Sequence, residues 1–168
     1  MTVSGPGLVL DGDFGLVDHD RRGVSLAEYS GRMAVMFFGF THCKVVCPRA
    51  LTKLDRVIRQ VDPAGTTVQG LYVTVDPERD TPAALQAYLR PTYPRFTGLT
   101  GDAETLAELR KAYKVFAQRR DEAGGGYNVP HSALVHVLDR ASRHIDHWPE
   151  TLDETAMEQR MRNALRAS

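Results

Sequence analysis

The chain has 168 residues, a hydrophobic share of 42%, a charged share of 25% and a formal net charge of zero. These values are typical of one globular domain that is large enough to bury a substantial core. The sequence contains no block of lysine or arginine, which excludes a basic surface for nucleic acid or anionic membranes. We therefore expect no nucleic-acid partner.

The two ends of the chain carry little information about its compartment. No run of 18 apolar residues is present, so we expect no membrane span within the sequence. The first residues lack the basic and apolar regions of a signal peptide. A cytoplasmic protein and a protein whose export segment lies outside this sequence both remain open. Residues 1–7 are expected to be disordered and residues 8–168 to form one domain.

Apolar periodicity predicts a strand followed by a helix in the first half of the chain. Residues 33–38 form an apolar run typical of a strand that is buried on both faces. From Pro48 onward one helical stripe repeats at three- and four-residue intervals, and residues 67–75 alternate as a second strand. Shorter strands are expected at Leu8–Leu10, Phe14–Val17 and Val24–Leu26. The helical stripe consists of Leu51, Leu54, Ile58 and Val61.

The second half of the chain predicts three capped helices, two short strands and a closing hairpin. Thr81 and Asp102 are expected to cap helices that reach about Leu89 and Tyr113, with Pro82 at the first helical position. A capping box at Thr151–Glu154 is expected to open the last helix. The remaining expected elements are strands at Phe96–Leu99, Lys114–Gln118, Ser132–Leu138 and Arg143–His147, with a hairpin tip at Gly124–Gly126.

The order of these elements indicates an α/β domain. The β-α-β start requires a right-handed crossover and a parallel pair of strands, whereas the closing hairpin adds antiparallel strands. The simplest architecture with this order is a thioredoxin-like fold, in which helices flank a mixed central β-sheet. The short strands before residue 27 form an N-terminal β extension.

The only two cysteines, Cys43 and Cys47, lie where the first core strand passes into a helix. Two cysteines are too few for a disulfide scaffold, which favours a catalytic, redox or metal-binding role. The unpaired N–H groups and positive dipole of a helix start favour thiolate, as does the charge of Lys44. Their spacing allows the sulfurs to close on one ion or to form a disulfide. The alternative is a pair of small buried apolar residues.

A second candidate ligand is His131, directly before the predicted strand at residues 132–138. In a thioredoxin-like sheet this loop lies against the cysteine-bearing turn, so His131 can serve as a third ligand or as a base. Two thiolates and one imidazole are a soft set that suits Cu(I) and also Cu(II), whereas zinc usually takes a fourth ligand. The preceding residue, Pro130, is a candidate for a cis peptide bond.

Other polar residues near these positions have simpler explanations. The loop at residues 76–81 is expected to cap the next helix, with a contribution to the site as the alternative. His42 adjoins Cys43, but adjacency alone makes it a poor co-ligand. Strand alternation places His144 and His147 on opposite faces, so no second metal site is expected there.

Three motifs in order resemble the Sco/SenC family of thioredoxin-like copper proteins. They are residues 37–48, residues 73–82 and the His131–Ser132 pair, and the similarity spans roughly residues 13–148. The resemblance implies copper as the bound metal, with Cys43, Cys47 and His131 as ligands. It also implies assembly of the dinuclear copper centre of cytochrome c oxidase. The implied partner is the copper-site subunit or another copper or thiol-exchange protein. The implied location is a membrane-anchored domain on the periplasmic side of the inner membrane, or in the intermembrane space.

The chain departs from the family pattern at two places. Lys44–Val45 stand where the family commonly has Pro-Asp, and Pro130 stands where it often has Asp. Loss of these carboxylates is expected to weaken Cu(II) more than Cu(I) and to favour thiolate chemistry. A metallochaperone is therefore the leading hypothesis and a thiol–disulfide oxidoreductase that uses Cys43 and Cys47 is the second. A peroxiredoxin-like peroxidase and a non-catalytic binding module are further alternatives.

Overall fold

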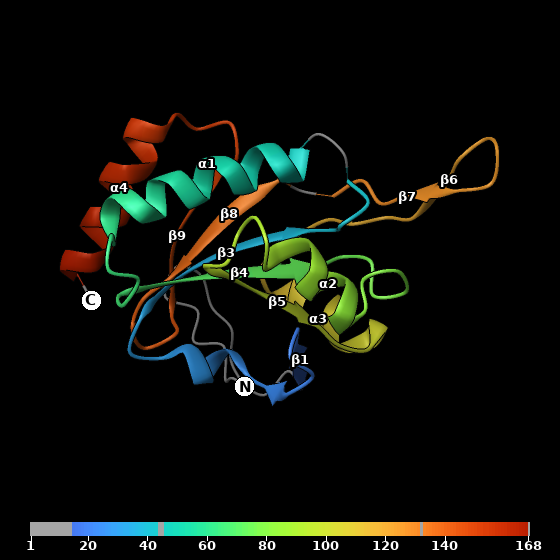
Figure 1. Ribbon diagram of the computed structural model, residues 1–168, viewed down its shortest axis with the longest axis horizontal. Coiled ribbons are helices and arrows are strands. Elements are labelled where there is room, and N and C mark those ends of the chain that lie inside the picture. The colour runs from blue at the N-terminus through green and yellow to red at the C-terminus, as the bar shows by residue number, and fades with distance from the viewer. Residues whose placement is uncertain (1–14, 44–45, 132, 168) are drawn as a thin grey trace.

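A seven-stranded sheet forms the centre of the computed structural model, which describes residues 15–43, 46–131 and 133–167 (Figure 1). The predictions for residues 1–10, and the start of the strand expected at 14–17, lie outside these ranges. In chain order the elements are β1 Leu16–Asp18, β2 Gly23–Val24, the 3-10 helix η1 Leu26–Tyr29, β3 Met33–Gly39, α1 Val46–Val61, β4 Val68–Thr74, α2 Pro82–Leu89, β5 Phe96–Thr100, α3 Ala103–Ala112, β6 Arg120–Asp121, β7 Tyr127–Asn128, β8 Leu134–Leu138, β9 His144–Pro149 and α4 Glu154–Ala167.

The strand order confirms the thioredoxin-like fold. The sheet runs β2-β1-β5-β4-β3-β8-β9. Its centre is parallel, because β4 pairs with β3 and β5 pairs with β4 in the same direction. The closing hairpin adds β8 antiparallel to β3 and β9 antiparallel to β8. The expected N-terminal β extension is present as the β1–β2 hairpin, which pairs through β1 with β5.

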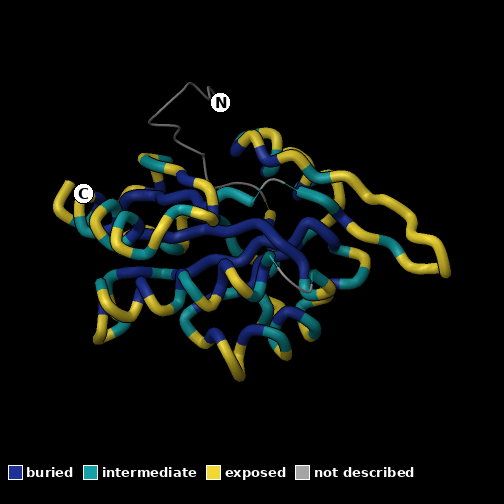
Figure 2. Tube along the Cα trace, turned by 90° about the horizontal axis from the view of Figure 1, so that it is seen from above, coloured by how far each residue is buried: buried dark blue, intermediate teal, exposed yellow. Residues whose placement is uncertain are grey.

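Helices cover both faces of the sheet and create two apolar cores. α1, α2 and α4 pack on one face, and α3 and η1 pack on the other. β3 lies between the two cores, and all seven of its residues are buried, as its continuous apolar run predicts. Figure 2 shows the buried central strands, in contrast to the β6–β7 hairpin, which is exposed along most of its length. The edge at which β3 ends is therefore held by packing from both sides.

Two of the three predicted helix caps are confirmed. The Thr81 side chain accepts from Ala84 N at 3.2 Å, and Asp102 accepts from Thr105 N at 2.7 Å. The capping box predicted at residues 151–154 is wrong, because Asp153 Oδ1 accepts from Ala156 N at 2.8 Å and caps α4 instead. Aspartate is as good a cap as threonine, so sequence spacing alone does not decide between neighbouring candidates.

Two further predictions, both of short strands, are wrong in detail. The strand expected at residues 24–26 ends at Val24, because η1 begins two residues later. The strand expected at 114–118 is reduced to one bridge between Ala117 and His131, because the residues before it close the last turn of α3. Lys114 has a φ of +57° there, which turns the chain out of the helix. Pro130 follows a trans peptide bond, since the described residues contain no cis bond.

Candidate metal centre

The two cysteines stand at the edge of the sheet where β3 passes into α1. Cys43 N donates to the Phe40 carbonyl at 3.1 Å, which turns the chain directly after the strand. Cys47 lies in the first turn of α1. Neither residue forms a disulfide; Cys43 is half-buried and Cys47 is fully buried. Cys43 is therefore the less buried of the two cysteines.

The environment of Cys47 keeps it protonated in the absence of a metal. The neighbouring thiol of Cys43 and burial both raise the pKa of Cys47, and they outweigh hydrogen bonds from Phe40 and Tyr72. The expectation that the helix start favours thiolate is therefore wrong for Cys47. Lys44, whose charge supported the same expectation, lies outside the described residues, as does Val45. A bound metal ion deprotonates a coordinating thiol outright, so this proton would leave when a metal binds.

The Cys47 sulfur is enclosed by Tyr72 and Gly39. A Cβ at position 39 would lie 2.6 Å from the Tyr72 hydroxyl and 2.7 Å from the Cys47 sulfur. The hydroxyl is buried beside the sulfur. Sequence reasoning missed Tyr72. The available signal was the parallel pairing of the two predicted strands, which brings their carboxyl ends to one edge and sets Tyr72 beside Phe37.

Asp80 fixes the loop that leads to Cys43. Its two oxygens accept from Thr41 N at 3.0 Å, from Thr41 Oγ1 at 2.6 Å and from Thr74 Oγ1 at 2.8 Å. Asp80 is fully buried. Burial raises the pKa of Asp80 in spite of these hydrogen bonds. The loop at residues 76–81 therefore caps α2 through Thr81, as expected. It also holds Thr41, two residues before Cys43, through Asp80.

Asp80 and Asp62 are expected to affect the pH dependence of stability in opposite directions. Burial would raise the pKa of Asp62, but hydrogen bonds from backbone N–H groups outweigh burial and lower it. The contribution of Asp62 to stability is therefore present above the ordinary Asp pKa of about 3.9, and is lost as the pH falls through its folded pKa. For Asp80 the raised folded pKa reverses the sign, so its contribution is present at low pH and is lost as the pH rises.

Urea unfolding of two variants tests these signs. The measurement runs from about pH 3 to 7, which spans the ordinary Asp pKa. As the pH rises, the unfolding free energy of Asp80→Asn should increase relative to that of the wild type. The unfolding free energy of Asp62→Asn should decrease relative to that of the wild type over the same range. Parallel pH courses for the two variants would contradict the assignment.

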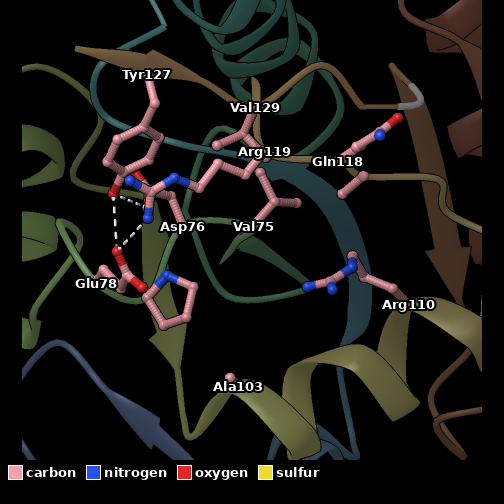
Figure 3. A pocket seen from close by; sticks show the side chains of 11 residues that line it. Val75, Asp76, Glu78, Ala103, Arg110, Gln118, Arg119, Tyr127 and Val129 are labelled. Atoms are coloured by element: carbon pink, nitrogen blue, oxygen red, sulfur yellow. Dashed lines mark hydrogen bonds and ion pairs between the residues drawn. The ribbon is translucent and has the colours of Figure 1, made fainter. Parts of the chain in front are cut away.

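The root of the β6–β7 hairpin docks onto the same loop around a cavity of about 210 Å³ (Figure 3). The Tyr127 hydroxyl donates to Asp76 Oδ1 at 2.8 Å, and Arg119 pairs with Glu78 at 3.0 Å. The guanidinium groups of Arg79 and Arg119 lie 3.7 and 3.8 Å from the centre of the Tyr127 ring. This cluster ties the start of the segment that leads to His131 to the loop that supports Thr41.

His131 presents one buried nitrogen that has no partner. Its Nδ1 lies 3.1 Å from the Val129 carbonyl. A carbonyl only accepts, so Nδ1 carries the proton and Nε2 carries the lone pair. Nε2 is buried and has no hydrogen-bond partner. The ring packs edge-on against Phe40 at 5.7 Å and Phe37 at 6.5 Å between centroids. A buried lone pair without a donor is what a metal ligand requires.

Phe40 is the neighbour that the three predicted ligands share. Its carbonyl accepts from Cys43 N, its backbone hydrogen-bonds with the Cys47 sulfur, and its ring contacts His131. The three ligand atoms do not all lie within 4.8 Å of one another, so coordination by all three requires a movement of the His131 side chain or its loop. The donor set fits a soft metal ion, because it combines two thiols with an imidazole.

A second set of potential ligands lies beside this site. Among the described residues, His42, Asp76 and Asp80 form the group whose ligand atoms all lie within 4.8 Å of one another. Both carboxylates already accept hydrogen bonds, from Arg79 and Tyr127 at Asp76 and from the two threonines at Asp80. We therefore interpret this group as a hydrogen-bonded support of the cysteine loop.

Comparison with known proteins places the chain in one family. Residues 4–166 match the SCO1/SenC family. The chain is 41% identical over 141 residues to the mitochondrial SCO2 homolog of Bos taurus, a match that covers 82% of this chain and 53% of that protein. It is 30% identical over 141 residues to the SCO2-like protein of Rickettsia felis, covering 83% of this chain and 69% of that protein. The chain thus spans about half the length of its bovine relative.

Solved structures agree with this placement. The Arabidopsis thaliana ScoI structure with copper bound superposes with a TM-score of 0.87 at 26% identity, covering 99% of this chain and 100% of that one. The Bradyrhizobium japonicum ScoI structure with copper bound gives a TM-score of 0.81 at 29% identity, with coverage of 98% and 100%. The fold, the sequence match and the order of the motifs lead to one conclusion: this chain belongs to the SCO1/SenC family.

Proposed function

We propose that this protein is a copper-binding metallochaperone whose ligands are Cys43, Cys47 and His131. The observation that carries the proposal is the buried Nε2 of His131, which has no hydrogen-bond partner and whose ring packs against Phe40, the residue that hydrogen-bonds with both cysteines. Thiolates select Cu(I), and imidazole also suits Cu(II), so the set can hold either oxidation state. The copper-bound structures of the Arabidopsis and Bradyrhizobium relatives support copper as the metal.

The exposure of Cys43 suits delivery by ligand exchange. A soft ligand of a partner can replace Cys43 first, because Cys47 is fully buried and Nε2 of His131 is a buried atom. We propose the copper-site subunit of cytochrome c oxidase, or another copper or thiol-exchange protein, as that partner. The role is assembly of the dinuclear copper centre.

We propose that the domain works on the periplasmic side of the inner membrane, with a membrane anchor. The relatives include mitochondrial and bacterial proteins, and one solved relative is described as a lipoprotein. No helix within the described ranges has the length and apolar character needed to cross a bilayer.

Replacing His131 by alanine is expected to weaken copper binding without removing it. Anaerobic titration of the reduced wild type with Cu(I) should show one tight site per chain. In His131→Ala the affinity for Cu(II) should fall more than the affinity for Cu(I), because two thiolates alone still select Cu(I). The matched control is His42→Ala, which removes an exposed histidine beside Cys43. Unchanged affinities in His131→Ala would show that His131 is not a ligand.

A thiol–disulfide oxidoreductase is the second candidate function. The half-buried Cys43, whose thiol neighbours that of the fully buried Cys47, is the observation in its favour. The Cys43 thiolate would attack a disulfide of the partner, form a mixed disulfide and release one partner thiolate. Cys47, after losing its proton, would attack Cys43 and release the second. Two electrons pass to the partner, and Cys43 and Cys47 become a disulfide.

Copper-free assays separate the two functions. An oxidoreductase should reduce a partner disulfide in His131→Ala but not in Cys47→Ser, with no copper present. Its Cys43–Cys47 disulfide should have a potential between about −270 and −120 mV, the range of thiol–disulfide oxidoreductases. A potential below about −300 mV is typical of a structural disulfide and would argue against this function.

A further inference from the structure

Three histidines gather on one face of the β8–β9 hairpin, contrary to the expectation from strand alternation. His147 lies directly opposite His136. The register shifts between Val137 and Leu138, which pair with Asp146 and His144, so Ile145 is an extra residue in β9. A β-bulge of this kind re-aims the side chains beside it. It brings His144 to the same face as His147, where the two rings stack at 5.8 Å.

The three imidazole rings lie close together, although their ligand nitrogens do not all fall within 4.8 Å of one another. His136 Nδ1 and His144 Nε2 are 3.2 Å apart. The ring of His136 lies 5.2 Å from that of His144 and 6.2 Å from that of His147. Tyr113, at the end of α3, packs over His136 and His144 at 5.2 and 5.6 Å. The cluster thus belongs to the sheet face that α3 covers.

The spacing of the inner pair suits metal coordination. Bonds of about 2.0–2.1 Å from zinc to imidazole nitrogen imply a separation of roughly 3.3 Å between two nitrogens in a tetrahedral site. The observed 3.2 Å is close to that value. A small rotation of the two rings directs both lone pairs at one ion in place of the hydrogen bond between them.

Burial decreases across the cluster from the inside outward. His136 is 2% exposed and its Nε2 has no hydrogen-bond partner, His144 is half-buried, and His147 is exposed. An ion can therefore enter from solvent on the His147 side. His147 has to turn its side chain to complete the set, and its exposure leaves room for that rotation.

The inner histidines are in the protonation state that binds metals. Burial and the neighbouring His144 and His147 lower the pKa of His136 to about 3. Burial and His147 also lower the pKa of His144. Both rings are therefore neutral at neutral pH and do not have to release a proton to free a lone pair. The nearby Asp146 is held by Arg160 and is not available as a ligand.

We propose that His136, His144 and His147 form a second metal site, separate from the cysteines, for a divalent ion of the zinc class. Three imidazole nitrogens and one water complete a four-coordinate shell. Imidazole suits Zn²⁺, Ni²⁺ and Cu²⁺, and the absence of thiolate removes the preference for Cu(I). The two sites of the protein thus differ in the metals that they select.

Titration with Zn²⁺ and Co²⁺ tests this site without the cysteines. The background is the full chain with Cys43→Ser and Cys47→Ser, whose folding is checked by thermal unfolding. We expect one Zn²⁺ per chain, a rise in Tm, and a visible d–d spectrum of tetrahedral Co²⁺ with nitrogen ligands. His144→Gln and His147→Gln should each lower the Zn²⁺ affinity by at least about tenfold, the minimum seen when even an outer-shell partner is lost.

The matched control in the same background is His42→Gln, which should leave Zn²⁺ binding unchanged. Absence of saturable binding would overturn the proposal, as would an affinity unchanged in His144→Gln. Loss of binding in His42→Gln would move the ion to Asp76 and Asp80, which also overturns it. Because both cysteines are absent, these results do not depend on whether the copper proposal holds.

Discussion

Replacing Cys47 by serine should abolish tight Cu(I) binding. Loss of an outer-shell partner lowers metal affinity by roughly 10–100-fold, and loss of a direct ligand should exceed that range. The physical reason is the donor atom, because a serine hydroxyl is a hard oxygen that does not replace a thiolate at Cu(I). Cys47 is also fully buried, so no water molecule from bulk solvent can readily take its place.

The measurement is an anaerobic competition against a Cu(I) chelator of known affinity. Cys43→Ser should lose affinity as well, but a soft ligand from solution can partly restore binding there, because Cys43 is half-buried. Added thiol should therefore rescue Cys43→Ser more than Cys47→Ser. Equal rescue of the two variants, or tight binding by Cys47→Ser, would contradict the proposed arrangement of an outer and an inner sulfur.

The same change bears on the redox alternative. Cys47→Ser leaves the Cys43 thiol able to form a mixed disulfide with a partner but removes the thiol that resolves it. An oxidoreductase would therefore accumulate the mixed disulfide, and a metallochaperone would not need it. Trapping of that species separates the two functions in one variant.

Local sequence patterns predicted most of the fold, because an apolar run or a helical stripe depends only on residues that are near one another in the chain. The apolar run of β3 and the helical stripe of α1 place the cysteines at a strand-to-helix turn without any knowledge of contacts. The pairing of β3 with β4 follows from the right-handed crossover between them. Caps were predictable in kind but not always in position, as Asp153 in place of Thr151 shows.

The rest depends on tertiary packing and was not predictable. One extra residue at Ile145 inverts the alternation of β9, and no residue type there signals it. The protonation of Cys47 is set by burial and by a second sulfur, which outweigh the helix start. The support that Asp80 gives to Thr41 joins segments that are distant in sequence. Each of these changes the chemistry expected of a residue that was already identified.

Replacing Gly39 by alanine should destabilise the protein and weaken copper binding together. In most extended positions this change is neutral or stabilising, because alanine restricts the unfolded chain. Here the new Cβ would lie 2.6 Å from the Tyr72 hydroxyl, 2.7 Å from the Cys47 sulfur and 2.8 Å from Tyr72 Cε1. Tyr72 cannot easily withdraw, since its ring stacks between Phe37 at 6.5 Å and Tyr88 at 6.0 Å.

Overpacking of a well-filled core typically costs about 1–3 kcal/mol, and we expect a loss of unfolding free energy in that range for Gly39→Ala. The Cu(I) affinity should fall as well, because the displaced atom is the Cys47 sulfur. Urea unfolding and the chelator competition measure the two effects. The control is Gly23→Ala in β2, where a Cβ meets nothing within 4 Å and stability should change by no more than about 0.5 kcal/mol.

Adding Tyr72→Phe to Gly39→Ala distinguishes the steric cause from a general loss of backbone freedom. The second change removes the hydroxyl, which is the atom closest to the new methyl group. The double variant should therefore regain part of the lost stability and part of the Cu(I) affinity. If the two losses simply add, the clash with Tyr72 is not their cause, and Gly39 is required by its backbone alone.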